Sequence, residues 1–258
     1  VDLSGLAVVA VPGEISIAAG GVQSSLDLGR GPIARGVWFD LSAVEARLLL
    51  VVHHLAVDGV SWRVLLEDLS TACAQLVSGS AVSLPAKTTA YRDWAERLME
   101  HAAGLEPAAV AAEEEWWCRE SGAPALALPV DLPGGRNRGV EARRVAVELS
   151  AEETRALLQE VPAAYRTRID EVLLTALART LTGPGQALRV NLEGHGREER
   201  LDGEGGGDLS RTVGWFTTLY PVALDLRGAP DPGAAIEAVK EQLRTIPNRG
   251  IGYGLLRW

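Results

Sequence analysis

The sequence has few of the residues on which disulfide scaffolds, metal centres and membrane spans depend. It contains two cysteines, one methionine and four histidines in 258 residues. Cys73 and Cys118 fall in segments with helical patterning and lack the spacing of metal ligands, so we expect buried thiols in a reducing cytoplasm. No apolar run approaches the length of a membrane span, and we therefore expect no membrane association.

The chain also lacks an excess of positive charge. Its 25 Lys and Arg residues stand against 34 Asp and Glu, which gives a formal net charge of -9. Phosphate-binding surfaces need clustered Lys and Arg, so nucleic acid is excluded as the expected partner. The length suits one large or two small domains with a real core. Because the chain opens with Val1 and its single methionine is Met99, we expect a piece of a longer protein.

The clearest pattern is a short apolar strand followed by an amphipathic helix. Residues 47–52 are almost wholly apolar and predict a buried strand. Apolar residues recur at helical spacing from Val60 to Val77, and Gly79 suits the left-handed turn after a helix end. His53 and His54 therefore lie where the strand ends, just before the partly positive start of a helix.

The histidine pair alone supports two interpretations. Successive strand side chains point to opposite faces, so His53 and His54 cannot both face one cavity. One is expected to pack, and the other is a candidate base that exchanges protons near neutral pH. Histidine pairs are nevertheless commonly structural, and Asp58 and Ser61 belong to residue types that cap helix starts.

The rest of the chain alternates helices and strands on both sides of a segment rich in proline, glycine and asparagine, residues 124–139. Before it we expect a strand over 36–41, paired with the strand ahead of the histidines, and helices over 90–102 and 107–119. After it we expect a strand over 140–149, a helix opened by a capping box at Ser150, a helix over 169–181 and a strand over 187–192. This order predicts an α/β fold with lobes 1–133 and 140–258 and a linker at 134–139.

A second polar stretch follows the last of these strands. Residues 193–197 read Glu-Gly-His-Gly-Arg, which brings a carboxylate, an imidazole and a guanidinium into one turn. On the residues alone, such a turn would be a solvated surface feature.

Together, the two stretches resemble the epimerization domains of nonribosomal peptide synthetases, which belong to the condensation superfamily related to chloramphenicol acetyltransferase. The resemblance covers essentially the whole chain. Its motifs occur in the family's order: His-His-x-x-x-Asp-Gly at residues 53–59, a helical motif at 170–178, Glu-Gly-His-Gly-Arg at 193–197, and two further motifs at 211–221 and 247–254.

The resemblance implies roles for individual residues. His54 and Glu193 would be the catalytic pair, and Asp58 would form an ion pair with Arg197 of the second lobe. His195 would shape its turn. The expected supporting residues are His53, Asp58, Gly59, Arg197, Trp215 and Tyr220. The implied fold is two-lobed and chloramphenicol acetyltransferase-like, each lobe a sheet with packed helices, and incomplete at both ends.

The implied reaction is epimerization at Cα of an L-aminoacyl or peptidyl thioester. The substrate would be carried on the 4'-phosphopantetheine arm of a neighbouring carrier domain, with no metal or soluble cofactor. Inversion needs one acid–base group on each face of the α-carbon, and burial would make Glu193 a stronger base. The helix that starts near Gly59 could help to stabilise the enolate.

Several alternatives are weighed against this interpretation. A condensation domain would use the same histidine to form a peptide bond but lacks the Glu-Gly-His-Gly-Arg motif. A silent docking domain would recruit a partner enzyme to the carrier. A zinc site and a serine hydrolase using Ser61 are disfavoured, because the ligand spacing and the Gly-x-Ser-x-Gly elbow are absent. Since family segments are missing at both ends, we expect the 258 residues alone to expose apolar surface, aggregate and show negligible activity.

Overall fold

The computed structural model describes residues 15–42, 44–123, 132–136, 138–182, 187–198 and 207–258. Packing divides the chain into two compact units that are each discontinuous in sequence. Unit 1 comprises residues 1–104 and 195–217, and unit 2 comprises residues 105–194 and 218–258.

These units differ from the expected sequential lobes in two segments. Residues 105–123 pack with unit 2 because their helix lies against a strand and a helix near the C-terminus. Residues 195–217 pack with unit 1 because Arg197 and its neighbours bind the start of a unit 1 helix. The expected linker at 134–139 stays a prediction, and Asn137 and residues 124–131 lie outside the described residues.

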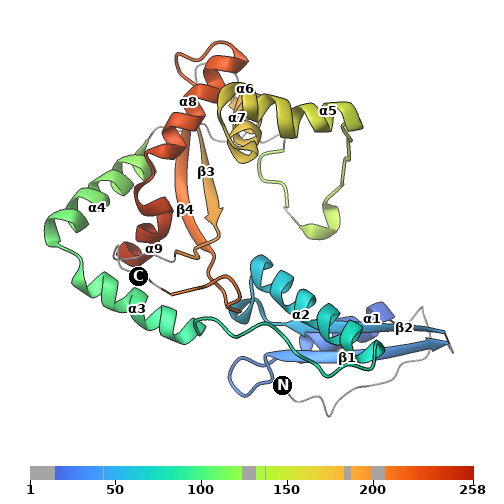
Figure 1. Ribbon diagram of the computed structural model, residues 1–258. Coiled ribbons are helices and arrows are strands. Elements are labelled where there is room, and N and C mark those ends of the chain that lie inside the picture. Colours follow the sequence, from blue (N-terminus) through green and yellow to red (C-terminus); the bar gives the residue numbers. More distant parts are fainter. Residues whose placement is uncertain (1–14, 43, 124–131, 137, 183–186, 199–206) are drawn as a thin grey trace. The chain divides into compact units, whose positions relative to one another are not determined.

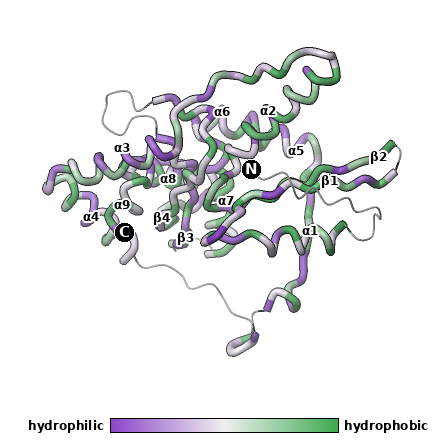
Figure 2. The backbone as a smooth tube through the Cα atoms, turned by 90° about the horizontal axis from the view of Figure 1, so that it is seen from below, coloured by the Kyte–Doolittle hydropathy of each residue, from purple (hydrophilic) through white to green (hydrophobic). Residues whose placement is uncertain are grey.

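Unit 1 is built on an antiparallel hairpin and helices that follow it in the chain (Figure 1). The expected pairing of the hairpin strands is confirmed, with Trp38 opposite Leu48. Gly79 adopts the expected left-handed conformation, with φ of 75°. The elements are α1 (Ile15–Ser24), β1 (Ala34–Ser42), β2 (Glu45–Val52), the 3₁₀ turn η2 (His54–Ala56), α2 (Gly59–Val77) and α3 (Tyr91–Gly104). Hydrophilic and hydrophobic residues alternate along the hairpin and along α3 (Figure 2).

Strand β2 is less buried than expected. Only Val51 is buried, whereas Leu48 is 41% exposed. Val37 and Phe39 of β1 fill one face of the hairpin, and the outer part of β2 has no second layer over it among the described residues. An apolar run of six residues therefore did not imply burial along its whole length.

The expectation of buried thiols is wrong for both cysteines, which are exposed. The buried side of α2 runs through Ser61 and Val64, and Cys73 lies off that stripe. In the helix of residues 107–122, Trp117 is buried. Cys118 is rotated from it by about 100° because a helix turns once in about 3.6 residues.

Unit 2 is built on two antiparallel strands with helices packed on them (Figure 1). The main strands and helices are α4 (Pro107–Gly122), α7 (Ile169–Thr182), β3 (Ala187–Gly194), β4 (Thr218–Asp225), α8 (Pro232–Arg244), η5 (Pro247–Gly250) and α9 (Ile251–Arg257). The shorter turns are η3 (Gly139–Glu141), α5 (Ala151–Arg155), the π turn η4 (Ala156–Glu160) and α6 (Val161–Tyr165). Its core includes Trp117, Leu188, Val222, Leu224 and Val239.

The strand expected over 140–149 is wrong. The segment forms η3 and then an extended chain, in which Val145 and Val147 are 89% and 92% exposed. Alternating apolar and charged residues suit a strand, but a strand also needs a hydrogen-bonded neighbour, and none of the described strands pairs with this segment. The capping box after it is confirmed: Ser150 Oγ accepts from Glu153 N, and the Glu153 carboxylate accepts from Ser150 N.

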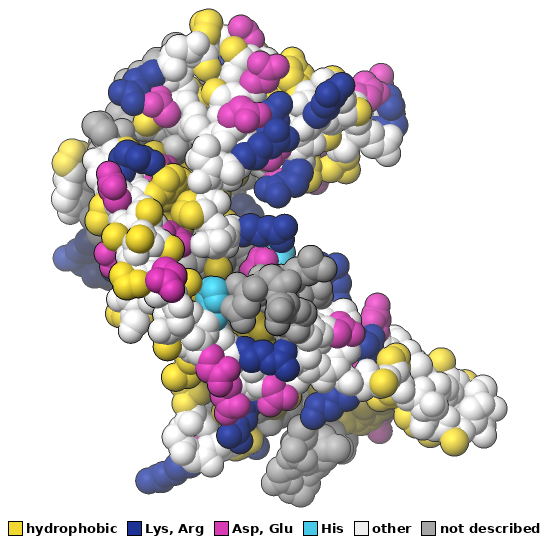
Figure 3. Space-filling view, turned by 60° about the vertical axis from the view of Figure 1, so that its left-hand side comes forward, with side chains coloured by type: hydrophobic (Ala, Val, Ile, Leu, Met, Phe, Trp, Pro, Cys, Tyr) yellow, Lys and Arg dark blue, Asp and Glu magenta, His cyan; other side chains and the backbone are white. Residues whose placement is uncertain are grey.

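The surface carries charge of both signs. Dark blue and magenta side chains are interspersed over the face shown in Figure 3, and neither sign covers it alone. Among the helices of the described ranges, none is both long and apolar enough to cross a bilayer.

Candidate active site

The histidine motif lies just past the end of β2. His53 precedes η2, and its Nδ1 accepts a hydrogen bond from Leu55 N at 3.1 Å. His54 begins the turn, is exposed, and presents its ring edge-on to Trp215 with the ring centroids 5.7 Å apart. The two side chains differ in their contacts, but the turn causes this rather than strand alternation, because β2 ends at Val52.

Asp58 caps the helix that follows. Its Oδ1 accepts from Ser61 N at 2.7 Å, and its Oδ2 accepts from Phe216 N at 3.3 Å. The side chain is buried, and its local role agrees with the preference for aspartate at helix starts. Gly59 is the first residue of α2, and a β-carbon there would meet open space, so crowding does not explain this glycine.

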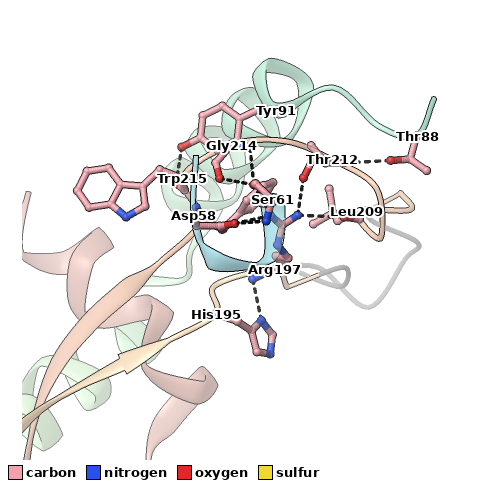
Figure 4. A network of polar contacts seen from close by, with 11 residues as sticks. Asp58, Ser61, Thr88, Tyr91, His195, Arg197, Leu209, Thr212, Gly214 and Trp215 are labelled. Carbon is pink, nitrogen blue, oxygen red and sulfur yellow. Dashed lines mark hydrogen bonds and ion pairs between the residues drawn. The ribbon is translucent and has the colours of Figure 1, made fainter. Parts of the chain in front are cut away.

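The expected ion pair between Asp58 and Arg197 is present. Arg197 Nη2 lies 2.9 Å from Asp58 Oδ1, and both side chains are more than nine-tenths buried. The same nitrogen donates to Ser61 Oγ at 2.9 Å, while Nη1 donates to the carbonyls of Leu209 and Thr212. Figure 4 shows these groups converging on the guanidinium. The pair joins segments of unit 1 rather than two separate lobes.

The environment of Asp58 favours its charged form. Burial by itself would raise the pKa of this carboxyl, but hydrogen bonds from Ser61, Arg197 and Phe216 outweigh burial and hold the pKa below its usual value. The guanidinium of Arg197 also lies over the ring of Phe216, 4.1 Å from its centroid. Asp58 is therefore a structural anion, as expected, rather than a base.

Ser61 fastens the residues 211–221 motif to this network. Its hydroxyl accepts from Gly214 N at 3.0 Å and donates to Gly214 O at 2.9 Å. Ser61 is fully buried at the third position of α2, so it is not the helix cap, and its contacts suit neither a nucleophile nor a triad member.

Gly214 leaves no room for a side chain, because a β-carbon there would overlap the ring of Tyr91. We expect Gly214→Ala to destabilise unit 1 by roughly 1–3 kcal/mol, as overpacking typically does. Thermal or urea unfolding would measure the loss. Gly59→Ala, whose β-carbon meets open space, is the matched control and should cost much less. Equal losses would show that the site around Gly214 adapts freely.

Tyr91 holds the residue that faces His54. Its hydroxyl donates to Trp215 O at 2.8 Å, and its ring meets Phe216 edge-on. Burial, and next the charge of Asp58, raise the pKa of the Tyr91 phenol, which keeps it protonated and able to donate. Trp215 is 39% exposed, so His54 and Trp215 form an accessible aromatic pair above a buried polar network.

The second motif begins on unit 2 and ends in unit 1. Glu193 lies near the end of β3 opposite Leu219 of β4, and its side chain is exposed. The burial expected for this carboxylate is therefore absent among the described residues. Tyr220 is buried on β4 and its ring packs near Trp117. The chain passes from unit 2 to unit 1 between Gly194 and His195.

His195 shapes its own turn. Its Nδ1 accepts from Arg197 N at 3.1 Å, as expected. Across the described residues, no group of His, Cys, Asp and Glu could hold a metal ion.

Three residues of the network were not singled out from the sequence. Tyr91 and Phe216 looked like ordinary core aromatics, and Ser61 looked like a cap. Each acts through a partner more than 100 positions away in the chain. The single signal for two of them was their place in motifs: Phe216 in residues 211–221, and Ser61 just after the aspartate and glycine of the first motif.

Comparison with known proteins identifies the class. The condensation domain family matches residues 12–258, so the chain belongs to that family. Its α/β fold agrees with solved structures of the family. It superimposes on the epimerization domain from the third module of tyrocidine synthetase B with a TM-score of 0.79 and 37% identity, over 93% of this chain and 53% of that one. The X-domain from teicoplanin biosynthesis shares the fold, with a TM-score of 0.69 and 23% identity over 95% and 55% of the chains.

Curated relatives are large peptide synthases. The chain is 50% identical to part of the linear gramicidin synthase of Brevibacillus parabrevis, over 95% of this chain and 3% of the matched protein. It is 46% identical to chondramide synthase cmdD of Chondromyces crocatus, over 100% of this chain and 6% of that protein. The chain thus spans a small part of these relatives and about half of the solved domains.

Proposed function

We propose that this chain is part of an epimerization domain, which inverts the α-carbon of an L-aminoacyl or peptidyl thioester. The observation that carries the proposal is the Glu-Gly-His-Gly-Arg motif, whose Arg197 is ion-paired with Asp58 of the histidine motif. Similarity to a solved domain described as an epimerization domain, at 37% identity, supports the same assignment.

In the proposed reaction, one base removes the Cα proton and the electron pair of the broken C–H bond moves onto the thioester oxygen. A second group then delivers a proton to the opposite face of the α-carbon, and the carbonyl re-forms. We assign these two roles to His54 and Glu193. Histidine exchanges protons near neutral pH without a large shift, and a carboxylate suits the partner role. The mechanism does not require a bound cofactor.

The remaining residues of the motifs are assigned to positioning. Asp58 fixes the start of α2 and the loop that carries His54. Trp215, held by Tyr91, contacts the imidazole from one side. Arg197 ends the motif that begins at Glu193, and its burial fixes the last residue of that turn. Fixed side chains lose less conformational freedom when substrate binds, which favours a productive geometry.

The substrate class follows from the proposed family function. We propose that a carrier domain presents the thioester on its 4'-phosphopantetheine arm and that neighbouring synthetase domains supply and consume it. The relatives, as long synthase chains, are consistent with such an arrangement.

A condensation domain is the second candidate, because the matching family carries that description. One experiment separates the two. An intact synthetase module is given a carrier loaded with an L-aminoacyl thioester, together with a second carrier that bears an amine acceptor. Epimerization predicts D-aminoacyl thioester without any acceptor. Formation of a dipeptide with no D isomer would replace our proposal with condensation.

A further inference from the structure

A three-residue turn in unit 2 has an unusual backbone. Asn248, Arg249 and Gly250 follow one another with φ of 46°, 52° and 86°, all in the left-handed region. Residues with a β-carbon adopt this region at a cost in free energy, and two such residues in a row are rare. Strain of this kind persists where surrounding contacts determine the conformation. The contacts that hold the turn therefore have a structural consequence.

Glu113 of α4 supplies one of these contacts. Its Oε2 accepts from Asn248 Nδ2 at 2.8 Å, and its Oε1 accepts from Trp117 Nε1 at 3.1 Å. The carboxylate also occupies the space above Gly252 in the first turn of α9, where a β-carbon would overlap it. Glu113 thus joins α4, the strained turn and α9. Charged acceptors make stronger hydrogen bonds than neutral ones, which suits this role.

The turn in its own right packs against the strands that carry Glu193. A β-carbon on Gly250 would overlap the ring of Tyr220, so the ring lies directly on the turn. Tyr220 pairs with Leu192 on β3, and the neighbouring pair is Glu193 with Leu219. A β-carbon on Gly194 would lie 3.6 Å from Tyr220 Cε1 and 3.9 Å from Arg249 O. The end of β3 therefore rests on Tyr220 and on the left-handed turn.

We propose that Glu113 is a positioning residue for the reaction: it latches the strained turn, and the turn with Tyr220 fixes the end of β3 and so the backbone of Glu193. The inference rests on the proposed function in one respect, namely that Glu193 is an acid–base group. Glu113 lies outside every motif quoted above, and it acts through the turn rather than on substrate.

The test compares Glu113→Ala with Glu114→Ala in an intact synthetase module. Glu114 is the next residue on the same helix, is exposed, and makes none of these contacts. Two quantities are measured. The first is amide hydrogen exchange of the peptides that contain the end of β3 and the start of β4. The second is the rate of Cα hydrogen exchange of a carrier-bound L-aminoacyl thioester, separated into kcat and KM.

For Glu113→Ala we expect faster amide exchange at the end of β3 and a kcat lowered by roughly ten- to a hundredfold, since small misplacements of catalytic groups have effects of that order. KM should change little, and Glu114→Ala should match the wild type in both measurements. Asn248→Ala removes the same hydrogen bond from the other side and should reproduce the loss.

A rescue variant separates the latch from a general loss of stability. Glycine adopts positive φ without steric cost, so Asn248→Gly no longer needs the latch. In the Glu113→Ala background, Asn248→Gly should restore most of the kcat and of the amide protection. This double variant also carries the measurement if Glu113→Ala alone does not fold.

Unchanged amide exchange in Glu113→Ala would overturn the proposal. Faster amide exchange with an unchanged kcat would overturn the positioning role and leave a contact that serves the fold. If the wild-type module shows no Cα exchange, the proposed function fails by itself, and the amide measurement still decides whether Glu113 fixes the end of β3.

Discussion

Replacing His54 by alanine in an intact synthetase module is expected to lower the exchange of Cα hydrogen with solvent deuterium by about 10²- to 10⁴-fold, the usual cost of losing one acid–base group. Glu193→Gln should cause a loss of the same order, because inversion needs a group on each face of the α-carbon. The two losses should not add in the double variant, since the groups act in one reaction.

The matched control is His53→Ala. The His53 ring accepts a hydrogen bond from Leu55 within its own turn, so this variant should lose much less activity than His54→Ala. Mass spectrometry of the released amino acid measures deuterium at Cα, and chiral chromatography measures the isomer ratio. Near-normal exchange and D-isomer formation in both His54→Ala and Glu193→Gln would refute the assignment of the two acid–base groups.

The second large effect concerns stability. Asp58→Ala is expected to lower the free energy of unfolding by about 3–5 kcal/mol, because it leaves the buried guanidinium of Arg197 without its anion. The variant also removes the N-cap of α2 and the acceptor for Phe216 N. Arg197→Ala should be costly as well, since Arg197 also donates to two carbonyls of the residues 209–212 segment.

The double variant is the decisive arm. In the background of Asp58→Ala, Arg197→Ala should add much less than it costs in the wild type, because the unpaired charge is then removed. Denaturant unfolding of the four proteins gives the coupling free energy. Additive losses would show that the two residues do not stabilise each other.

The same carboxyl predicts a dependence of stability on pH. Hydrogen bonds hold the pKa of Asp58 below its usual value in the folded chain, despite the opposing effect of burial. Its contribution is therefore fully present above the unfolded pKa of about 3.9 and is lost as pH falls through that value towards the folded pKa. Asp58→Asn should show a smaller loss of melting temperature between pH 6 and pH 3, within roughly the same window. An unchanged pH dependence would contradict this assignment.

Local features of the fold could be predicted well from the sequence. Helix α2, its stop at Gly79 and the capping box at Ser150 depend on residues within a few positions of one another, so the pattern that forms them is visible in the chain. The hairpin pairing was predictable for the same reason, because β1 and β2 are adjacent. The resemblance to epimerization domains further predicted the Asp58–Arg197 pair.

Long-range packing could not be predicted in the same way. Residues 140–149 have the alternation of a strand, but a ladder partner decides whether a strand forms, and the pattern of one segment does not contain its partner. The side that Cys73 presents depends on what packs against α2. Tyr91 and Glu113 matter through contacts with Trp215 and Asn248, which are far away in the chain.

The central claim is that this chain carries out inversion at Cα, and one measurement tests it most directly. A carrier within the intact module is loaded separately with the L and the D isomer of one aminoacyl thioester in deuterium oxide, and the isomer ratio is followed with time. Our account predicts that both reactions approach the same ratio and that the inverted product carries deuterium at Cα. If each isomer keeps its configuration and no deuterium enters, the chain is not an epimerization domain.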